Sequence, residues 1–189
     1  TMTSLAPIKT GTSIGEGLDF VPQPSTRYAI VRCSGQKTLR IANELFNNFG
    51  IHAWVPITIN PRPRKGQKRV TPTLPGFVFI PTKEIDRAEK LSERRLIPAF
   101  SVLVTNGVES TCTQRELEEF NRAVNETNID VSTFKQGLKV GDRVTITSGP
   151  LAGNSGELTS VYVEKTLMVS MTMGATPKVV LPAAFVSNH

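Results

Sequence analysis

The chain has 189 residues, enough for one domain or two small ones, and 39% of them are hydrophobic, which suits globular cores. No apolar run approaches the roughly 18 residues that a membrane span needs, and residues 1–26 lack the basic start and apolar core of a secretory signal. Two cysteines and two histidines form neither a disulfide framework nor a metal-binding pattern, so we expect a cytoplasmic protein without metal or cofactor.

The net charge of +6 is unevenly distributed along the chain. Residues 27–124 contain 16 basic and 9 acidic residues, whereas residues 138–189 contain 4 basic and 3 acidic ones. An excess of positive charge favours contact with a polyanion such as nucleic acid. We therefore expect nucleic acid to meet the first of these two segments.

Residues 1–26 mix small polar residues, glycine and proline, and we expect them to form a disordered tail. Residues 27–124 are expected to form an α+β domain, an antiparallel sheet with flanking helices. Hydrophobic periodicity, Gly50 as a helix stop, and the capping pair Thr113 and Glu116 define its elements. We predict strands at 28–33, 51–59, 77–80 and 99–105, and helices at 39–49, 83–95 and 113–124.

Residues 125–137 have few apolar residues and no period, which is typical of a linker. Short β-rich runs follow in residues 138–189, punctuated by glycine turns. Gly149, Gly153 and Gly156 suit positions with positive φ or a close approach of two backbones. This pattern predicts a small all-β barrel of SH3-like size, with strands near 144–146, 158–163, 167–171 and 178–181.

Segment 141–156 resembles the KOW motif, in which an apolar strand runs into Gly-Pro, an apolar residue and two spaced glycines. The downstream segment 175–186 resembles the end of NusG proteins. Arg27-Tyr28, Pro75-Gly76-Phe77, segment 97–107 and the helix at 113–124 resemble the NGN domain of the same family. The chain is therefore identified as a member of the NusG family, and segment 28–36 leans towards the specialised RfaH-like paralogues. It departs from the pattern at Arg27, where the family usually has Trp.

This resemblance implies a transcription elongation or antitermination factor that suppresses pausing or termination. Its NGN-like domain would dock an apolar patch onto the clamp of the largest subunit of RNA polymerase. The residues that match this patch are Tyr28, Leu74, Phe77, Ile97 and Phe100. Phe77 and Phe100 are also explained as ordinary core residues, as is Phe79. We expect Tyr28 to be partly exposed, because its hydroxyl needs a partner.

Segment 62–69 puts five basic residues into eight positions, with no acid among them. Each cationic side chain is able to approach a phosphate, so we expect backbone contact with DNA, although an ordinary solvated loop is the alternative. The residues concerned are Arg62, Arg64, Lys65, Lys68 and Arg69. The resemblance implies upstream DNA at this loop and non-template DNA at Arg32, Lys37 and Arg40. Arg94 and Arg95 are explained more simply as a solvated helix end.

The near-neutral KOW domain is expected to bind a protein, and the family implies a small-subunit ribosomal protein or Rho. Leu151 occupies the apolar tip position that makes such a contact, although a barrel-closing role explains it equally. A KOW-type RNA-binding protein associated with the ribosome is the alternative function, but it calls for a more basic domain. The sequence has no nucleophile elbow, P-loop or metal-ligand cluster, so we do not expect an enzyme.

Overall fold

The computed structural model describes residues 27–59, 62–67, 70–125, 138–163, 167–173 and 176–188. The predicted tail at 1–26 and all but the first residue of the predicted linker lie outside these ranges. The chain divides into two compact units, the first being Thr1–Val104 with Glu109–Gln114 and the second Thr105–Val108 with Arg115–His189. This division groups the helix predicted at 113–124 with the C-terminal strands. The domain boundaries expected from the sequence stay a prediction.

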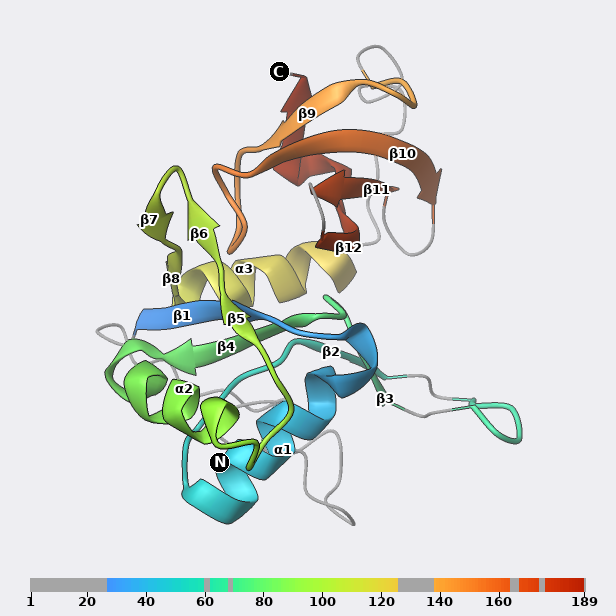
Figure 1. Cartoon of the computed structure of the whole chain (residues 1–189). Coiled ribbons are helices and arrows are strands. Elements are labelled where there is room, and N and C mark those ends of the chain that lie inside the picture. Colours follow the sequence, from blue (N-terminus) through green and yellow to red (C-terminus); the bar gives the residue numbers. More distant parts are fainter. Residues whose placement is uncertain are drawn as a thin grey trace. The chain divides into compact units, whose positions relative to one another are not determined.

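The first unit is a mixed α/β structure built on an antiparallel sheet around β1 (Arg27–Arg32) (Figure 1). Strand β4 (Phe77–Pro81) pairs with one side of β1 along its length. On the other side β1 pairs with β5 (Ser101–Val102) near its end and with β8 (Thr111–Thr113) near its start. The middle of β1 and all of β4 are buried, which agrees with their continuous apolar sequences.

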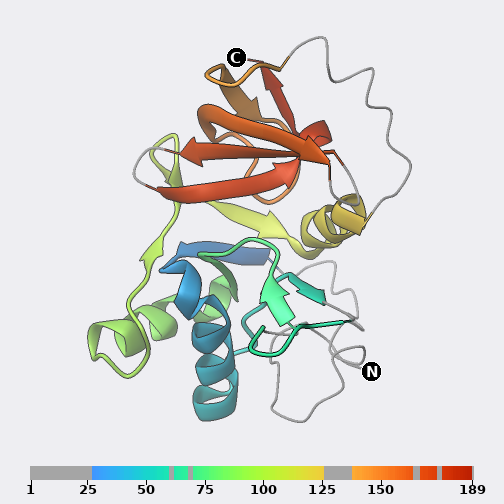
Figure 2. The ribbon, with the colours of Figure 1, turned by 90° about the vertical axis from the view of Figure 1, so that its right-hand side faces the viewer.

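Two α-helices of this unit lie on the same side of the sheet, as two perpendicular views show (Figures 1 and 2). Helix α1 (Thr38–Phe49) follows the 3-10 turn η2 (Gly35–Lys37), and α2 (Ile85–Glu93) follows η3 (Thr82–Glu84). Gly50 ends α1 with a φ of +66°, as predicted. The helical spacing predicts a buried face of Leu39, Ala42, Leu45, Phe46 and Phe49. Ala42 and Leu45 are buried, whereas the other three are half-exposed and Ile41 is fully buried instead.

The single strand expected at 51–59 is wrong. Only β2 (Ile57–Ile59) forms there, and it pairs with β3 (Val70–Pro72), which lies in a segment predicted to be a loop. Trp54 instead makes one isolated bridge with Phe79, and the rings of these two buried residues are 5.9 Å apart. The proline that separates Trp54 from β2 has no N–H to continue a sheet ladder, which explains the break.

The strand expected at 99–105 is likewise broken into β5 and β6 (Val104–Thr105). Strand β6 turns back through Asn106 and Gly107 into β7 (Val108–Glu109). Both turn residues have positive φ, +52° and +79°, as a two-residue hairpin turn requires.

The second unit contains α3 (Gln114–Asn125) from residue 115 onward and a five-stranded antiparallel sheet in the order β12-β11-β10-β9-β13. The strands are β9 (Arg143–Ile146), β10 (Ser155–Val163), β11 (Leu167–Met173), β12 (Thr176–Pro182) and β13 (Val186–Asn188), with η4 (Ala183–Phe185) before the last. The rings of Phe120 in α3 and Phe185 are 5.9 Å apart. In the described part of the chain no pairing joins β12 to β13, so closure into a barrel stays a prediction.

Candidate nucleic-acid interface

The turn Pro75-Gly76 before β4 fixes the segment that leads into α1. The Cys33 amide donates a hydrogen bond to the Gly76 carbonyl oxygen at 2.8 Å. Gly76 has a φ of +92°, and a Cβ atom there would lie 3.1 Å from the Cys33 carbonyl oxygen, so a larger residue is disfavoured on both counts. The Pro-Gly-aromatic motif identified in the sequence therefore stabilises the position of the start of α1 next to β4.

Thr38, the first residue of α1, completes this connection with a fully buried side chain. Its hydroxyl donates to the Gly35 carbonyl oxygen at 2.8 Å and accepts from the Gly76 amide at 2.7 Å. This hydroxyl is costly to lose, because the buried Gly76 amide would remain without a partner. The Gly35 carbonyl oxygen would keep one, since it also accepts the Thr38 backbone N–H. Thr38 thus sets where the first turn of α1 lies, and with it the positions of Lys37 and Arg40.

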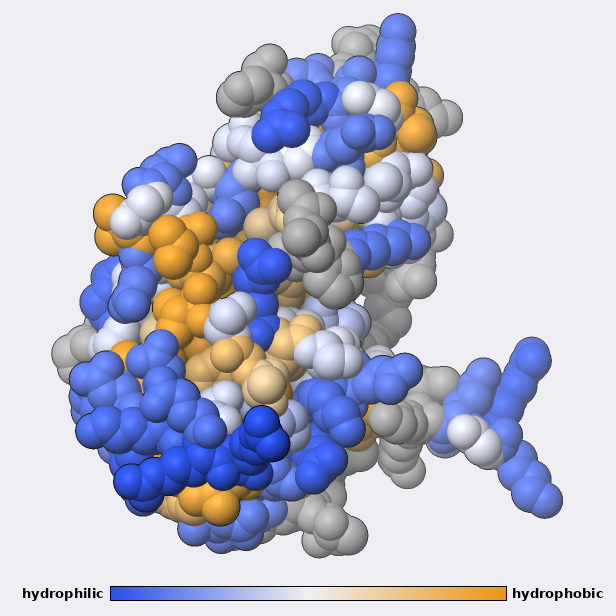
Figure 3. Space-filling view, viewed as in Figure 1, coloured by the Kyte–Doolittle hydropathy of each residue, from blue (hydrophilic) through white to orange (hydrophobic). Residues whose placement is uncertain are grey.

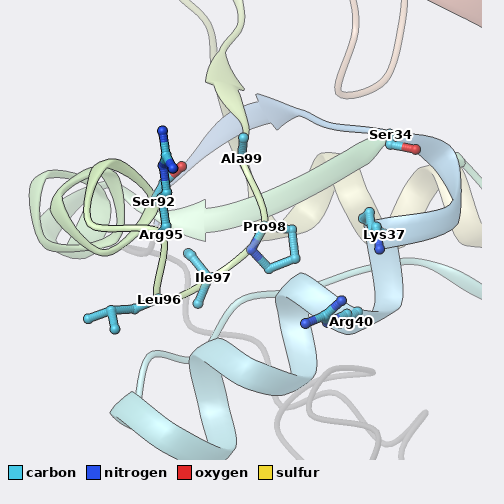
Figure 4. A pocket seen from close by; sticks show the side chains of 9 residues that line it. All are labelled: Ser34, Lys37, Arg40, Ser92, Arg95, Leu96, Ile97, Pro98 and Ala99. Atoms are coloured by element: carbon cyan, nitrogen blue, oxygen red, sulfur yellow. The ribbon is translucent and has the colours of Figure 1, made fainter.

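A pocket of about 550 Å³ lies between this first turn and the segment that joins α2 to β5 (Figure 4). We call it the basic pocket. Figure 4 shows Lys37 and Arg40 on the α1 side, facing the chain that runs through Ile97 and Pro98. The residues that line the pocket are Ser34, Lys37, Arg40, Ser92, Arg95, Leu96, Ile97, Pro98 and Ala99.

Three of these nine residues are cationic, namely Lys37, Arg40 and Arg95, and none of the nine is acidic. A sphere of 550 Å³ is about 10 Å across, which is close to the Debye length in 0.1 M salt. An anion inside the pocket would therefore lie within about one Debye length of the residues that line it. Arg40 also pairs with Glu44 at 2.9 Å within α1, an exposed pair that offsets part of its charge. The start of α1 adds the positive end of a helix dipole.

Besides the three cations, Ser34 and Ser92, the basic pocket has an apolar wall. It consists of the four consecutive residues 96–99, of which Leu96 has 53% of its surface exposed whereas Ile97 is buried. In the orientation of Figure 1, hydrophobic surface lies around β5 and hydrophilic surface over α2 (Figure 3). The pocket thus combines positive charge, from Lys37 and Arg40 on one side and Arg95 on the other, with the apolar surface of residues 96–99.

The loop between β2 and β3 supplies a second group of cations. The register of the two strands, with Ile59 opposite Val70, makes the segment between them a hairpin loop, of which the structure describes residues 62–67. Within it Arg62, Arg64 and Lys65 are all exposed. A turn orders this part, because the Gln67 amide donates to the Arg64 carbonyl oxygen at 2.9 Å. The predicted DNA contacts Lys68 and Arg69 lie outside the described residues.

Arg32 ends β1, and it lies apart from the other two residues predicted to contact non-template DNA, since it does not line the basic pocket. It pairs in register with Phe77 and Ser101. Its buried Nε atom has no hydrogen-bond partner among the described residues. The structure therefore brings Lys37 and Arg40 together in one pocket and leaves Arg32 outside it.

Four of the five residues predicted to contact the polymerase are buried. Leu74 and Phe77 are each 1% exposed, and Ile97 and Tyr28 are 4% and 6% exposed. The expectation that Tyr28 would be partly exposed is wrong, and its burial, together with Cys112, raises the pKa of its hydroxyl to about 12. Phe100 alone among the five is half-exposed. Leu74 and Phe77 are too buried to contact a partner directly, but they pack beneath the residues that form the surface. Contact of this surface with the polymerase stays a prediction.

Leu151, the residue expected to contact a partner of the C-terminal domain, is 1% exposed in the second unit. It lies in the turn between β9 and β10, where the Asn154 side-chain amide donates to its carbonyl oxygen at 2.8 Å. Its burial favours the alternative role as a packing residue, and contact with a partner would require it to become accessible.

Within the described ranges there is no group of three or more histidine, cysteine or acidic side chains placed to hold a metal ion. Nor does any helix in those ranges have the length and apolar character to cross a membrane.

No protein-family model and no curated protein matches the sequence. Solved structures do match. NusG of Thermotoga maritima is 24% identical, with coverage of 87% of this chain and 97% of that one, and a TM-score of 0.33. The MjSpt4:Spt5 complex matches in two conformations, at 17% and 15% identity, over 86% of this chain and 99% and 98% of the other, with TM-scores of 0.27 and 0.25. All three TM-scores are below 0.5, so neither fold nor function follows from these likenesses.

The pocket contains residues that the sequence does not single out. The sequence explains Arg95 as part of a solvated helix end, and it predicts no role for Leu96 or Pro98. One signal is present in the sequence. The residue that follows a helix is often glycine or asparagine. Neither follows α2, so the residues after this helix were candidates for a role other than ending it.

Proposed function

We propose that this chain is a transcription elongation or antitermination factor of the NusG type. Its first domain, residues 27–124, binds the clamp of the largest RNA polymerase subunit and contacts upstream or non-template DNA beside it. Its second domain, residues 138–189, recruits another protein, such as a small-subunit ribosomal protein or Rho. The mechanism is one of bracing, in which the bound factor suppresses pausing or termination without chemistry of its own.

The observation that carries the proposal is the grouping of cations in the first unit. Lys37, Arg40 and Arg95 surround an acid-free pocket, and Arg62, Arg64 and Lys65 extend from a separate hairpin loop of the same unit. Two cationic sites on one unit suit a polyanion that is long enough to reach both. The C-terminal segment has only 4 basic residues against 3 acidic ones, which suits a protein partner better.

Docking on the polymerase clamp would use the apolar surface next to the basic pocket. Phe100 is half-exposed and Leu96 is 53% exposed, so both have surface to offer a partner. The buried residues Tyr28, Leu74, Phe77 and Ile97 would hold that surface in shape. Aromatic side chains at the centre of an interface often contribute on the order of 2 kcal/mol or more, which makes Phe100 the best anchor.

The loop provides the first test. The triple variant Arg62→Ala, Arg64→Ala and Lys65→Ala should bind an assembled elongation complex more weakly, while binding free core polymerase nearly as well as the unchanged protein. For every phosphate that the variant no longer neutralises, the slope of log K against log salt should become shallower by about 0.9. Binding to both targets would be measured by fluorescence anisotropy over a salt series.

The matched control removes three cations from another exposed place, with Lys83→Ala, Arg87→Ala and Lys90→Ala on η3 and α2. It changes the net charge equally, so any general electrostatic effect appears in both variants. Equal losses for the two triple variants, or equal losses on the elongation complex and on free polymerase, would contradict a DNA contact at the loop. Tight binding to ribosomal RNA in place of polymerase would favour the ribosomal alternative.

A further inference from the structure

Arg32 stands apart from the other basic residues of the chain. It is half-buried, whereas every other lysine or arginine whose exposure the structure describes is exposed. Its Nε atom is buried without a hydrogen-bond partner, and the side chain takes part in none of the ion pairs between described residues. A guanidinium in this state is unfavourable, because it has lost contact with water without gaining an acceptor. The described part of the chain therefore does not explain the charge at this position.

The neighbours of Arg32 define a small site at the end of β1. Within the antiparallel sheet, Arg32 lies opposite Phe77 of β4 on one side and opposite Ser101 of β5 on the other (Figure 1). Side chains of directly opposite residues lie on the same face of a sheet, with their Cβ atoms about 4.5–5.5 Å apart. The Arg32 side chain thus lies between that of Phe77, which is buried, and that of Ser101, which is exposed.

We propose that Arg32 and Ser101 bind one carboxylate side chain of the protein that docks on the adjacent apolar surface. The carboxylate accepts hydrogen bonds from the Nε–H and a terminal N–H of Arg32, an arrangement that is among the strongest in proteins, and from the Ser101 hydroxyl. No hydrogen bond to a described residue holds Nε in place, so the guanidinium is able to turn outward to this acceptor. Phe100, the proposed anchor for RNA polymerase, directly precedes Ser101. This contact deepens the polymerase docking proposed above and rests on it.

The surroundings of Arg32 favour a carboxylate over a phosphate of DNA. A nucleic-acid strand carries a charge at every nucleotide and is best held by several cations, as in the basic pocket or the hairpin loop. Arg32 belongs to neither group, and it lies next to buried Phe77 and to the hydrophobic surface around β5 (Figure 3). A protein partner covers apolar surface and presents single charged side chains within it, and arginine is enriched among the residues that contribute most to such interfaces.

The experiment compares Arg32→Met with Arg27→Met in the full chain. Both variants remove one arginine from β1, but Arg27 is exposed and its guanidinium already donates to the Thr111 hydroxyl at 2.7 Å. Arg32→Met should weaken binding to free core RNA polymerase by roughly tenfold, the loss expected for a charge-assisted contact. Arg27→Met should change it by less than about twofold, as an ordinary surface substitution does. Fluorescence anisotropy of the labelled chain measures both.

Two further variants test the chemistry of the contact. Arg32→Lys keeps the charge but not the planar fork of donors, and it should still bind core polymerase roughly fivefold more weakly than the unchanged protein. Ser101→Ala loses one neutral hydrogen bond and should bind roughly threefold more weakly. Full binding by Arg32→Met would overturn the proposal. So would a loss that appears on the elongation complex alone, because it would identify a phosphate of DNA as the ligand.

Thermal unfolding separates this role from a structural one. Arg32→Met should not lower the midpoint, because Nε has no described partner to lose and methionine keeps the apolar stem of the side chain. A midpoint lower than that of Arg27→Met would show that Arg32 has a partner within the chain, which would also overturn the proposal.

A nuclear magnetic resonance measurement tests the site without polymerase. Because Nε is buried, its proton should exchange slowly with water and give a resonance that is missing from Arg32→Met. A short amidated peptide with a single glutamate should shift this resonance of the full chain in a saturable way, and its glutamine counterpart should not. Equal shifts with the two peptides would refute a carboxylate site. If the unchanged chain fails to bind polymerase but the glutamate peptide gives the shift, the proposed function fails and the carboxylate site stands.

Discussion

At Gly156 in β10 a Cβ atom would overlap the carbonyl oxygen of Thr172 on the neighbouring strand β11. Gly149 and Gly153 have φ values of +81° and +92°, and a Cβ on Gly149 would also lie 2.7 Å from the ring of Phe185. The sequence predicts a special backbone at all three glycines, and the structure confirms it. It does not predict which of the three is constrained by conformation and which by space, because that depends on the strand that pairs opposite.

Gly156→Ala should lower the free energy of unfolding by about 3 kcal/mol, at the upper end of overpacking effects, because the new methyl group meets backbone that cannot rotate away. Gly35→Ala is the control, since a Cβ there would lie at an ordinary 3.5 Å from the Pro75 Cβ and its φ is not in the left-handed region. That control should stay within about 0.5 kcal/mol of the unchanged protein. Urea unfolding followed by circular dichroism measures both, and similar midpoints for the two variants would refute the steric explanation.

Among the elements, those with a strong local pattern were predictable and those defined by their partners were not. The apolar run of β4 and the capped helix α3 follow from the sequence alone. Strand β8 (Thr111–Thr113) is short and polar, and only its pairing with β1 makes it a strand. Strand β13 was missed for the same reason, since it pairs with β9 across most of the second unit's sequence.

The candidate site, too, could be predicted from the sequence only in part. Lys37 and Arg40 were predicted from charge and from the family resemblance, but the pocket also needs the segment after α2, which lies more than fifty residues further along the chain. Their placement depends on Thr38 and the Gly76 turn. No sequence period indicates a contact of this kind, because it joins two segments through one side-chain hydroxyl.

Thr38→Val should therefore disturb both stability and the site. The substitution keeps the shape of the side chain but leaves the buried Gly76 amide without its partner, which should cost about 1–3 kcal/mol. It should also weaken the proposed binding of DNA at Lys37 and Arg40, since the first turn of α1 loses its attachment. Thr38→Ser keeps the hydroxyl and should preserve binding. If Thr38→Val unfolds at the same urea concentration as the unchanged protein, the hydroxyl does not anchor α1.

At the scale of the whole molecule, the distribution of charge separates the proposed roles. Residues 27–124 hold 16 of the 22 basic residues, and six of these line the basic pocket or lie in the described part of the hairpin loop. Residues 138–189 contain 4 basic and 3 acidic residues, and most of strand β11 in their sheet is buried. This distribution is what the proposed function requires, with nucleic acid contacting the first domain and a protein partner the second while the chain is bound to RNA polymerase.

The most direct test of these roles is retention of purified core RNA polymerase by the immobilised full chain at moderate salt, with circular dichroism to show that the chain is folded. We predict stable retention, and a clear loss with Phe100→Ala, which removes the best-exposed aromatic of the proposed docking surface. A folded chain that fails to retain the polymerase would contradict the central claim.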